Sequence, residues 1–252
     1  MEKDLNGKVS IVTGGGSGIG QAAALLYAAH GAKVVVSDIN EQGGKNVEEQ
    51  IKQLGGESIF IKADVSKSEE CELLANKTIE AFGRIDIAFN NAGIGGESNG
   101  IADMSIEGWN KIIAVNLSSV FYCMKYQLQQ MIKQGNGAII NNSSILGSVG
   151  FTNAAGYVAA KHGVIGLTKN AALEYSTKGI RVNAVGPAFI NTPLLTEAGI
   201  EGEVKNTLVR LHPIGRFGEP NEVAELVIWL SSDKASFVTG SYYAIDGGYL
   251  AQ

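Results

Sequence analysis

The chain has 252 residues, of which 45% are hydrophobic and 18% charged, and its formal net charge is -5. This length and apolar content fit one α/β domain with a buried core and exclude a disordered chain. The net charge is negative, and acidic and basic residues are interspersed along the chain, which argues against nucleic acid and membranes as partners. Because the sequence has neither a long apolar run nor a secretory core at its start, we expect a cytoplasmic protein.

The cysteines and histidines do not form a recognisable metal site. Cys71 and Cys123 fall in predicted helices without the paired spacing of metal ligands, and three histidines are scattered along the chain. We therefore expect buried free thiols in a reducing compartment and no metal in catalysis.

The first predicted elements form a βαβ unit. An apolar strand over 8–13 leads into the glycine-rich segment 14–20, a helix over 21–30 and a strand over 33–37 that ends on Asp38. Glycines let the backbone approach a pyrophosphate, and the following helix N-terminus supplies N–H donors. Asp38 is placed to accept the ribose hydroxyls of an adenosine. Its alternative role is that of an ordinary acid at a helix N-terminus.

Strands and helices continue to alternate along the chain. Helices are predicted over 40–54, 66–82 (opened by a capping box at 66–69), 105–133, 158–175 and 221–231, and strands over 58–62, 86–90, 138–142, 180–185 and 242–245. This order predicts a single α/β domain over 1–252, a Rossmann-type doubly wound parallel sheet of about seven strands with helices on both faces. Ligands should bind beyond the carboxyl ends of the strands. The residues at these ends are Gly14, Asp38, Asp64, Asn90, Ser144 and Gly186.

Tyr157 and Lys161 are four residues apart at the start of a predicted helix and therefore share one helix face. A neighbouring ammonium favours the phenolate and lowers the pKa of a tyrosine towards neutral pH, where proton transfer is efficient. Ser144 follows a strand, and its hydroxyl is placed to reach the substrate oxygen that exchanges a proton with Tyr157. The alternative is a core tyrosine with a satisfied hydroxyl and a lysine that reaches solvent.

With these motifs in order, the chain resembles the short-chain dehydrogenase/reductase family over essentially its whole length. The matching residues are Thr13-Gly14-x-x-x-Gly18-x-Gly20, Asp64, Asn90-Asn91-Ala92-Gly93, Asn116, Ser144, Tyr157-x-x-x-Lys161, Asn183 and Thr192. The resemblance implies interconversion of a secondary alcohol and a ketone, with Tyr157 as general acid/base and Ser144 polarising the substrate oxygen. It also implies that Lys161 lowers the Tyr157 pKa and binds the nicotinamide ribose, while Asn116 anchors a water that links Lys161 to solvent.

The resemblance further implies which residues bind the dinucleotide. They are Gly14, Ser17, Gly18, Ile19, Gly20, Asp38, Asp64, Val65, Asn91, Ala92, Gly93, Tyr157, Lys161, Pro187, Ile190 and Thr192. Asp38 predicts NAD(H) rather than NADP(H), because a carboxylate accepts the ribose 2′-hydroxyl and repels a 2′-phosphate. The nicotinamide supplies the hydride, so the protein needs only placement, a proton carrier and a dry pocket.

The substrate is expected to be a neutral, moderately apolar secondary alcohol or ketone, because no arginine cluster is available to clamp an acid. The predicted pocket residues are Ile94, Gly95, Ile145, Leu146, Phe151, Ala188 and Phe189. Segment 187–215 is a predicted substrate lid, although its apolar residues also fit an ordinary core. These are Leu194, Leu195, Ile200, Val204, Leu208 and Leu211. Ala188 stands where many relatives have glycine, which leaves the local backbone path open.

The helices over 105–133 and 158–175 are apolar on more than one face, which suggests a subunit interface. Relatives commonly pair these helices, so the resemblance implies a homotetramer, and we also consider a structural metal ion at the terminal carboxylate. Three other functions share some of these features. A nucleotide sensor or a methyltransferase would not need the Tyr157–Lys161 pair. A serine hydrolase would need a Gly-x-Ser-x-Gly elbow directly between a strand and a helix, whereas the one match, at 96–100, does not directly follow a predicted strand.

Overall fold

Seven apolar strands form one parallel sheet in the order β3-β2-β1-β4-β5-β6-β7. The computed structural model describes residues 4–252. The strands are β1 (Val9–Thr13), β2 (Lys33–Asp38), β3 (Ser58–Lys62), β4 (Ile87–Asn90), β5 (Gly137–Asn142), β6 (Ile180–Pro187) and β7 (Tyr242–Ile245). The strand order reverses between β1 and β4, which in this class of fold is where a ligand cleft opens. The predicted Rossmann-type sheet is confirmed.

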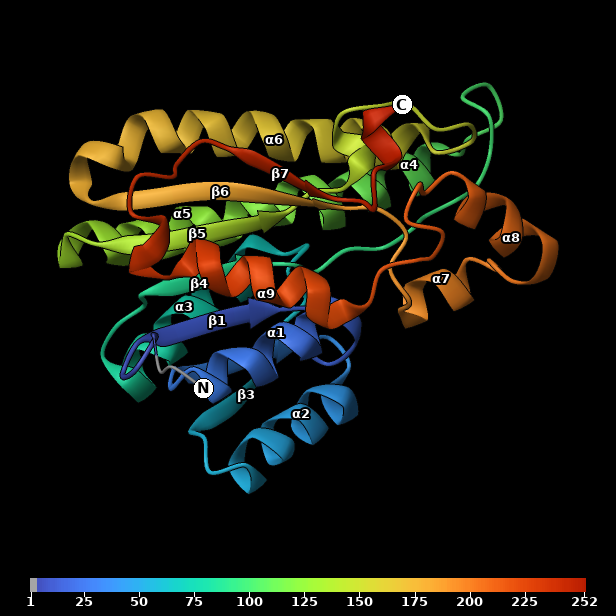
Figure 1. Cartoon of the computed structure of the whole chain (residues 1–252). Helices are drawn as coiled ribbons and strands as arrows, with labels where there is room; N and C mark the ends of the chain where they lie inside the picture. Colours follow the sequence, from blue (N-terminus) through green and yellow to red (C-terminus); the bar gives the residue numbers. More distant parts are fainter. Residues whose placement is uncertain (1–3) are drawn as a thin grey trace.

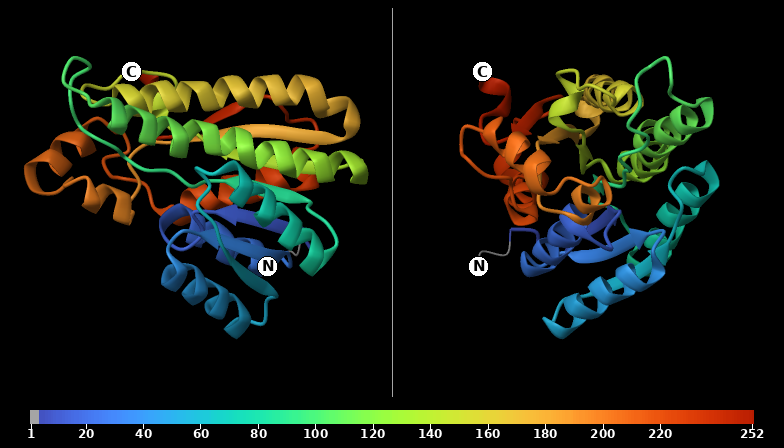
Figure 2. Two further views of the ribbon diagram at one scale, coloured as in Figure 1. Left: turned by 180° about the vertical axis from the view of Figure 1, so that it is seen from behind. Right: turned by 90° about the vertical axis from the view of Figure 1, so that its right-hand side faces the viewer.

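Helices cover both faces of the sheet (Figures 1 and 2). The α-helices described by the structure are α1 (Gly18–Ala29), α2 (Glu41–Gln53), α3 (Ser68–Phe82), α4 (Ile106–Ile113), α5 (Ser119–Gln134), α6 (Ala155–Tyr175), α7 (Pro193–Glu197), α8 (Gly202–Arg210) and α9 (Pro220–Ser231). Helices α1, α2 and α9 pack on one face, and α3, α5 and α6 pack on the other. None of the helices within residues 4–252 combines the length and hydropathy needed to cross a membrane.

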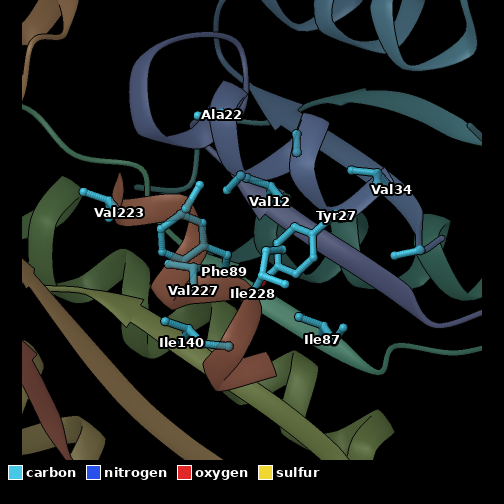
Figure 3. Packing of buried hydrophobic residues seen from close by; sticks show 14 of the residues in the cluster. Val12, Ala22, Tyr27, Val34, Ile87, Phe89, Ile140, Val223, Val227 and Ile228 are labelled. Carbon is cyan, nitrogen blue, oxygen red and sulfur yellow. The ribbon is translucent and has the colours of Figure 1, made fainter. Parts of the chain in front are cut away.

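The core between α1, α9 and the sheet is shown in Figure 3. Phe89 and Ile87 of β4 belong to the same buried cluster as Val227 of α9, and all three are at most 2% exposed. Tyr27 of α1 is fully buried, and its hydroxyl forms a 2.8 Å hydrogen bond with Ser231 Oγ of α9. A buried hydroxyl without a partner would be destabilising, so this bond allows the tyrosine to fill the core.

The helix predicted over 105–133 is divided into α4, a π-helical turn η1 (Ala114–Ser118) and α5. A π turn inserts one residue into the helical register, and such turns are frequent at functional sites. Asn116 lies inside this turn and is fully buried. The π turn spans only five residues inside a long helical stretch, and so short an interruption does not show in the hydrophobic periodicity of the sequence.

The capping box predicted at 66–69 is wrong. Helix α3 begins at Ser68, and its N-cap Lys67 makes no side-chain capping bond. The Ser66 hydroxyl instead donates to Asp64 Oδ1 at 2.6 Å. Glu70 Oε2 accepts the main-chain N–H of Asp64 at 2.7 Å, so the acid that follows stabilises the end of β3 instead of its own helix.

The backbone after β6 is regular in spite of Ala188. Strand β6 pairs with β7 as far as Pro187, and the Ala188 N–H donates to the Ile245 carbonyl at 3.1 Å. Asn153 is the only non-glycine residue between 4 and 252 with a positive φ. Alanine at position 188 therefore needs no left-handed conformation.

Segment 187–215 contains α7 and α8, which extend beyond the layered body of the protein (Figure 1). Leu208 is buried, whereas Leu194, Val204 and Leu211 are exposed by 37%, 55% and 37%. Most of the apolar residues of this segment are therefore not part of the core. This favours the lid over the core interpretation, and closure over a ligand stays a prediction.

Candidate active site

A cavity of about 550 Å³ lies where β1 to β5 end. Its wall is formed by the glycine-rich loop, the segments after the strands, the first turns of α6 and the start of the 187–215 segment. All of the predicted dinucleotide-binding residues line this cavity except Gly20, Pro187 and Ile190. Residues that are far apart in the sequence therefore meet at the carboxyl ends of the strands, as predicted.

The glycine-rich loop after β1 is shaped by backbone requirements. Gly14 and Gly18 have φ values of +60° and +53°, which side-chain-bearing residues rarely adopt. Gly20 makes a different contribution, because a Cβ atom there would collide with the Gly14 carbonyl oxygen and stand 2.7 Å from Asn91 Nδ2. It allows close packing of α1 against the end of β1, while the first part of the loop faces the cavity.

The loop after β4 is fastened to the glycine-rich loop. Thr13 Oγ1 accepts the main-chain N–H groups of Asn91 at 3.0 Å and Ala92 at 3.2 Å. Asn91 Nδ2 in turn donates to the carbonyl oxygens of Thr13 at 3.0 Å and Gly14 at 3.1 Å. Four hydrogen bonds thus join the ends of two neighbouring strands and fix the floor of the cavity.

Asp38 presents its carboxylate at the cavity wall. Its Oδ2 atom accepts the Gly16 N–H at 2.9 Å, and its Oδ1 atom accepts the Asn40 N–H at 2.8 Å. Each carboxylate oxygen keeps further lone pairs for a ligand, since an ionised carboxylate has about four acceptor positions. The side chain is held in one orientation and remains partly exposed.

Asp64 and Val65 follow β3 and form the next part of the wall. The Ser66 hydroxyl bound to Asp64 holds the pKa of that carboxyl below its ordinary value, with burial acting in the opposite direction. Asp64 is therefore an anion at neutral pH. Val65 is 7% exposed and packs beside Cys71 and Cys123, so its position depends on the contact between α3 and α5.

Tyr157 and Lys161 both line the cavity from α6, and Lys161 Nζ is 5.5 Å from the centre of the Tyr157 ring. Lys161 is 3% exposed, and burial lowers its pKa to about 8. Its ammonium donates to the carbonyl oxygen of Asn142 at 2.7 Å. The predicted shared helix face is thus confirmed, and the lysine does not reach solvent.

The protonation of Tyr157 differs from expectation. Burial raises the pKa of its phenol, and a hydrogen bond with Ser144 opposes this only in part. The sequence predicted the opposite direction because it placed a cation nearby but gave no measure of burial. Tyr157 is accordingly a phenol at neutral pH, in the form that can donate a proton.

Ser144 is held on both sides. Its Oγ atom accepts the Leu146 N–H at 3.1 Å and caps the short helix η2 (Ile145–Gly147). Its carbonyl oxygen accepts the Tyr242 hydroxyl from β7 at 2.9 Å. A longer contact of 3.5 Å links Ser144 Oγ to the Pro187 carbonyl, which places Pro187 behind the serine.

Asn116 joins the π turn to the loop after β4. Its Oδ1 atom accepts the Ile94 N–H and its Nδ2 atom donates to the Ile94 carbonyl, each at 2.8 Å. A Cβ atom on Gly93 would stand 3.0 Å from Asn116 Oδ1 and 3.7 Å from Lys161 Nζ. Gly93 therefore keeps a side chain out of the space between these two groups. The predicted water relay through Asn116 stays a prediction.

The predicted substrate residues are spread over several environments. Ile94 lines the cavity, and a Cβ on Gly95 would stand 3.9 Å from Leu194 Cδ1. Ile145 and Leu146 are buried, at 1% and 8% exposure. Phe189 contacts several rings, and Ala188 lies between it and the last residue of β6, Pro187. These neighbouring rings belong to Phe151, His212, Phe217 and Tyr249. Contact between these residues and the substrate stays a prediction.

Sequence reasoning missed several residues of the cavity wall. They include Ile39, Ala63, Ser66, Lys111, Ala114, Val115 and Asn142, whereas Pro193 and Leu194, which also line the cavity, belong to the segment predicted as the lid. Asn142 ends β5, so the rule that identified Asp38 at the end of β2 could also have found it. Lys111, Ala114 and Val115 give no such signal, because only the packing of α4 and the π turn directs them to the cavity.

The chain is similar over nearly its whole length to known proteins. A family model described as "Enoyl-(Acyl carrier protein) reductase" matches residues 14–250. The cyclohexanol dehydrogenase of Acinetobacter sp. (strain SE19) is 50% identical over 252 residues, covering 100% of this chain and 98% of the relative. A 2,5-dichloro-2,5-cyclohexadiene-1,4-diol dehydrogenase of Sphingobium indicum is 44% identical over 98% of this chain and 99% of its own. The crystal structure of levodione reductase superposes with a TM-score of 0.96 at 37% identity, covering 98% of this chain and 99% of the other.

Proposed function

The chain belongs to the short-chain dehydrogenase/reductase family and is an oxidoreductase that acts on CH–OH groups, and we propose that it interconverts a cyclic secondary alcohol and its ketone with NAD(H). The observation that carries this proposal is the meeting of Ser144, Tyr157 and Lys161 beside a cavity that also contains Asp38. The first three residues fit proton transfer at a substrate oxygen, and Asp38 fits an adenosine ribose.

The residues present fit a dinucleotide for physical reasons. In the glycine-rich loop, a Cβ atom added at Gly14, Gly16 or Gly20 would collide with neighbouring atoms, so the backbone is left open to a ligand. The loop leads into the N-terminus of α1, which supplies N–H donors for a pyrophosphate. Asp38 offers acceptor positions for two ribose hydroxyls, and its charge disfavours a 2′-phosphate. Ile39, the next residue, supplies no cation to offset that repulsion. These features support NAD(H) as the cofactor.

A bound nicotinamide would supply or accept the hydride. Tyr157, a phenol at neutral pH, would donate its proton to the oxygen of a ketone, or as a phenolate take one from an alcohol. Ser144 would hold the same oxygen by a second hydrogen bond. Lys161 would bind the nicotinamide ribose and replace the proton of Tyr157, and Asn116 and Gly93 would maintain the space beside its ammonium.

A cyclic, uncharged substrate is supported by the apolar residues of the cavity wall and by the two relatives. Ile94, Val115 and Leu194 line the cavity, and Leu194 belongs to the proposed lid. The two relatives named above are dehydrogenases of ring alcohols by their names. We extend this substrate class to the present chain.

We also propose a homotetramer in the cytoplasm. An exposed groove of about 490 Å³ lies between α6 and the η1–α5 segment and is lined by Leu117, Phe121, Tyr122 and Leu167, with Gly163 and Ser118. An apolar groove of this kind suits a second copy of the same helices. The Sγ atoms of Cys71 and Cys123 are 3.6 Å apart without a bond between them, which suits a reducing compartment.

The decisive measurement follows the reduced-nicotinamide absorbance band while purified protein is given cyclohexanol, substituted cyclohexanols and linear secondary alcohols, each with NAD and with NADP. We expect turnover of ring alcohols with NAD. Turnover of linear alcohols in preference to ring alcohols would contradict the substrate class. Equal or better use of NADP would contradict the cofactor assignment.

A further inference from the structure

Asn142, the last residue of β5, carries a buried acceptor without a partner. The residue is 9% exposed and is one of those that line the cavity. Within residues 4–252, its Oδ1 atom is one of four buried side-chain atoms that have no hydrogen-bond partner. The other three belong to His30, Ser37 and His212, and none of these residues is part of the cavity wall. The unpaired acceptor at the candidate site therefore needs its own explanation.

The orientation of the Asn142 amide follows from its neighbours. Asn91 Nδ2 contacts two carbonyl oxygens, those of Thr13 and Gly14. Carbonyl oxygens only accept hydrogen bonds, so the amide nitrogen of Asn91 must face them and its Oδ1 atom must face Asn142. Asn142 Nδ2 donates to that atom at 2.9 Å. The Oδ1 atom of Asn142 is thereby directed away from Asn91, and flipping its amide would place two oxygens face to face.

The preceding residue shows what a purely structural asparagine looks like in the same strand. Asn141 is fully buried on the opposite face of the sheet, and both ends of its amide have partners. Its Oδ1 atom accepts from Asn90 Nδ2 at 2.9 Å, and its Nδ2 atom donates to Thr168 Oγ1 at 3.0 Å. Buried amides are normally satisfied in this way, and one left unpaired at a ligand cavity points to a ligand group as its partner.

We infer that Asn142 is a cofactor-binding residue whose Oδ1 atom accepts a hydrogen bond from the nicotinamide half of the dinucleotide. This inference rests on the proposed function. Two groups in that half can donate, the hydroxyls of the ribose and the N–H₂ of the carboxamide. The main-chain carbonyl of the same residue holds the Lys161 ammonium at 2.7 Å. Asn142 therefore connects three parts of the site: the glycine-rich loop through Asn91, the lysine through its carbonyl, and the cofactor through Oδ1.

The test is binding, measured by NADH fluorescence and by displacement with ADP. Asn142→Leu keeps nearly the same volume and removes the acceptor. We expect its Kd for NADH to rise about five- to tenfold, the loss of one neutral hydrogen bond. The Kd for ADP should stay within twofold, because ADP occupies only the adenosine and pyrophosphate positions. Should Asn142→Leu fail to fold, Asn142→Ala is measured in the same way.

A matched control and an analogue complete the design. Asn141→Leu should lower the melting temperature and leave the NADH affinity within twofold. The reduced 3-acetylpyridine analogue lacks the carboxamide N–H₂. If Asn142→Leu weakens this analogue as much as NADH, the ribose is the donor, and if it weakens NADH alone, the carboxamide is; both results support the inference.

Two outcomes would overturn the inference by itself. One is an Asn142→Leu protein that binds NADH as the wild type does. The other is a loss of ADP affinity as large as the loss of NADH affinity, which would mean that the variant acts only through Asn91 and the glycine-rich loop. Wild-type protein that binds no nicotinamide dinucleotide would overturn the proposed function as well.

Discussion

The carboxylate of Asp38 accepts the main-chain N–H of Gly16 at 2.9 Å, which fastens the end of β2 to the glycine-rich loop after β1. A Cβ atom on Gly16 would stand 2.9 Å from the same carboxylate oxygen, so a glycine is needed for this approach. The acid that is proposed to select the cofactor therefore also holds the glycine-rich loop. Its replacement should change both cofactor selectivity and loop geometry.

Asp38→Ser should reduce the ratio of kcat/KM with NAD to kcat/KM with NADP by about two orders of magnitude. A like-charge repulsion of about 3 kcal/mol corresponds to that factor, and serine removes the charge while keeping a short acceptor. Both cofactors are measured with one substrate. Adding Ile39→Arg should increase the use of NADP further, whereas an unchanged ratio in Asp38→Ser would refute the role of the charge.

Tyr157→Phe should lower kcat about 10²- to 10⁴-fold, the usual contribution of a general acid/base. The ring and its packing are kept, and only the proton donor is lost. NADH affinity, measured by fluorescence, should remain within a few-fold of wild type. A variant that turns over at the wild-type rate at neutral pH would exclude Tyr157 as the proton donor.

The stability of the free protein should depend on the titration of Lys161. Burial lowers its pKa from 10.5 to about 8, so between these values the native state binds fewer protons than the unfolded state. Stability from this group therefore increases as pH rises through that window, by about 3 kcal/mol in total. Lys161→Met lacks the group. Urea unfolding of both proteins from pH 7 to 10.5 should show that the free energy of unfolding of wild type rises relative to that of the variant.

The comparison with Lys161→Met cancels the other titrating groups, including the buried tyrosines. Two unfolding curves that stay parallel over the whole range would show that the native ammonium titrates normally. The same variant should also lose turnover and bind NADH more weakly, because the ammonium is assigned both tasks.

Asn116→Ala should destabilise the loop after β4. The Ile94 N–H and carbonyl would both lose their partner, at a cost of about 1–3 kcal/mol for each group that stays buried. We expect a lower melting temperature together with reduced turnover. Asn110→Ala, at an exposed position of α4, is the control and should match wild type. Full activity and stability in Asn116→Ala would contradict the structural role given to this amide.

Phe121→Lys should break the proposed assembly. Phe121 is 49% exposed at the groove between α6 and the η1–α5 segment, and a lysine there would place charges in an apolar contact between copies. Light scattering should report a tetramer for wild type and smaller species for the variant. Leu54→Lys, 77% exposed at the end of α2, should leave the mass unchanged. A wild-type monomer at micromolar concentration would refute the assembly.

Local sequence patterns were enough to predict the alternation of strands and helices, the parallel sheet and most of the residues at its carboxyl edge. These features depend on local patterns, since continuous apolar runs predict buried strands and glycines followed by a helix predict a close backbone approach. Asp38, Ser144, Tyr157 and Lys161 could be named for the same reason. Each of them occupies a position that the order of elements alone sends to one edge of the sheet.

Features that depend on burial and on contacts between distant segments could be seen only in the folded protein. The Tyr157 pKa rises because desolvation outweighs the hydrogen bond with Ser144, and a sequence carries no measure of desolvation. The Ser66 hydroxyl can bond either Asp64 or the first turn of a helix. It bonds Asp64, because α3 begins only at Ser68 in the folded protein. The free acceptor of Asn142 arises because three strand ends meet at Asn91, and only the packed sheet brings them within hydrogen-bonding distance.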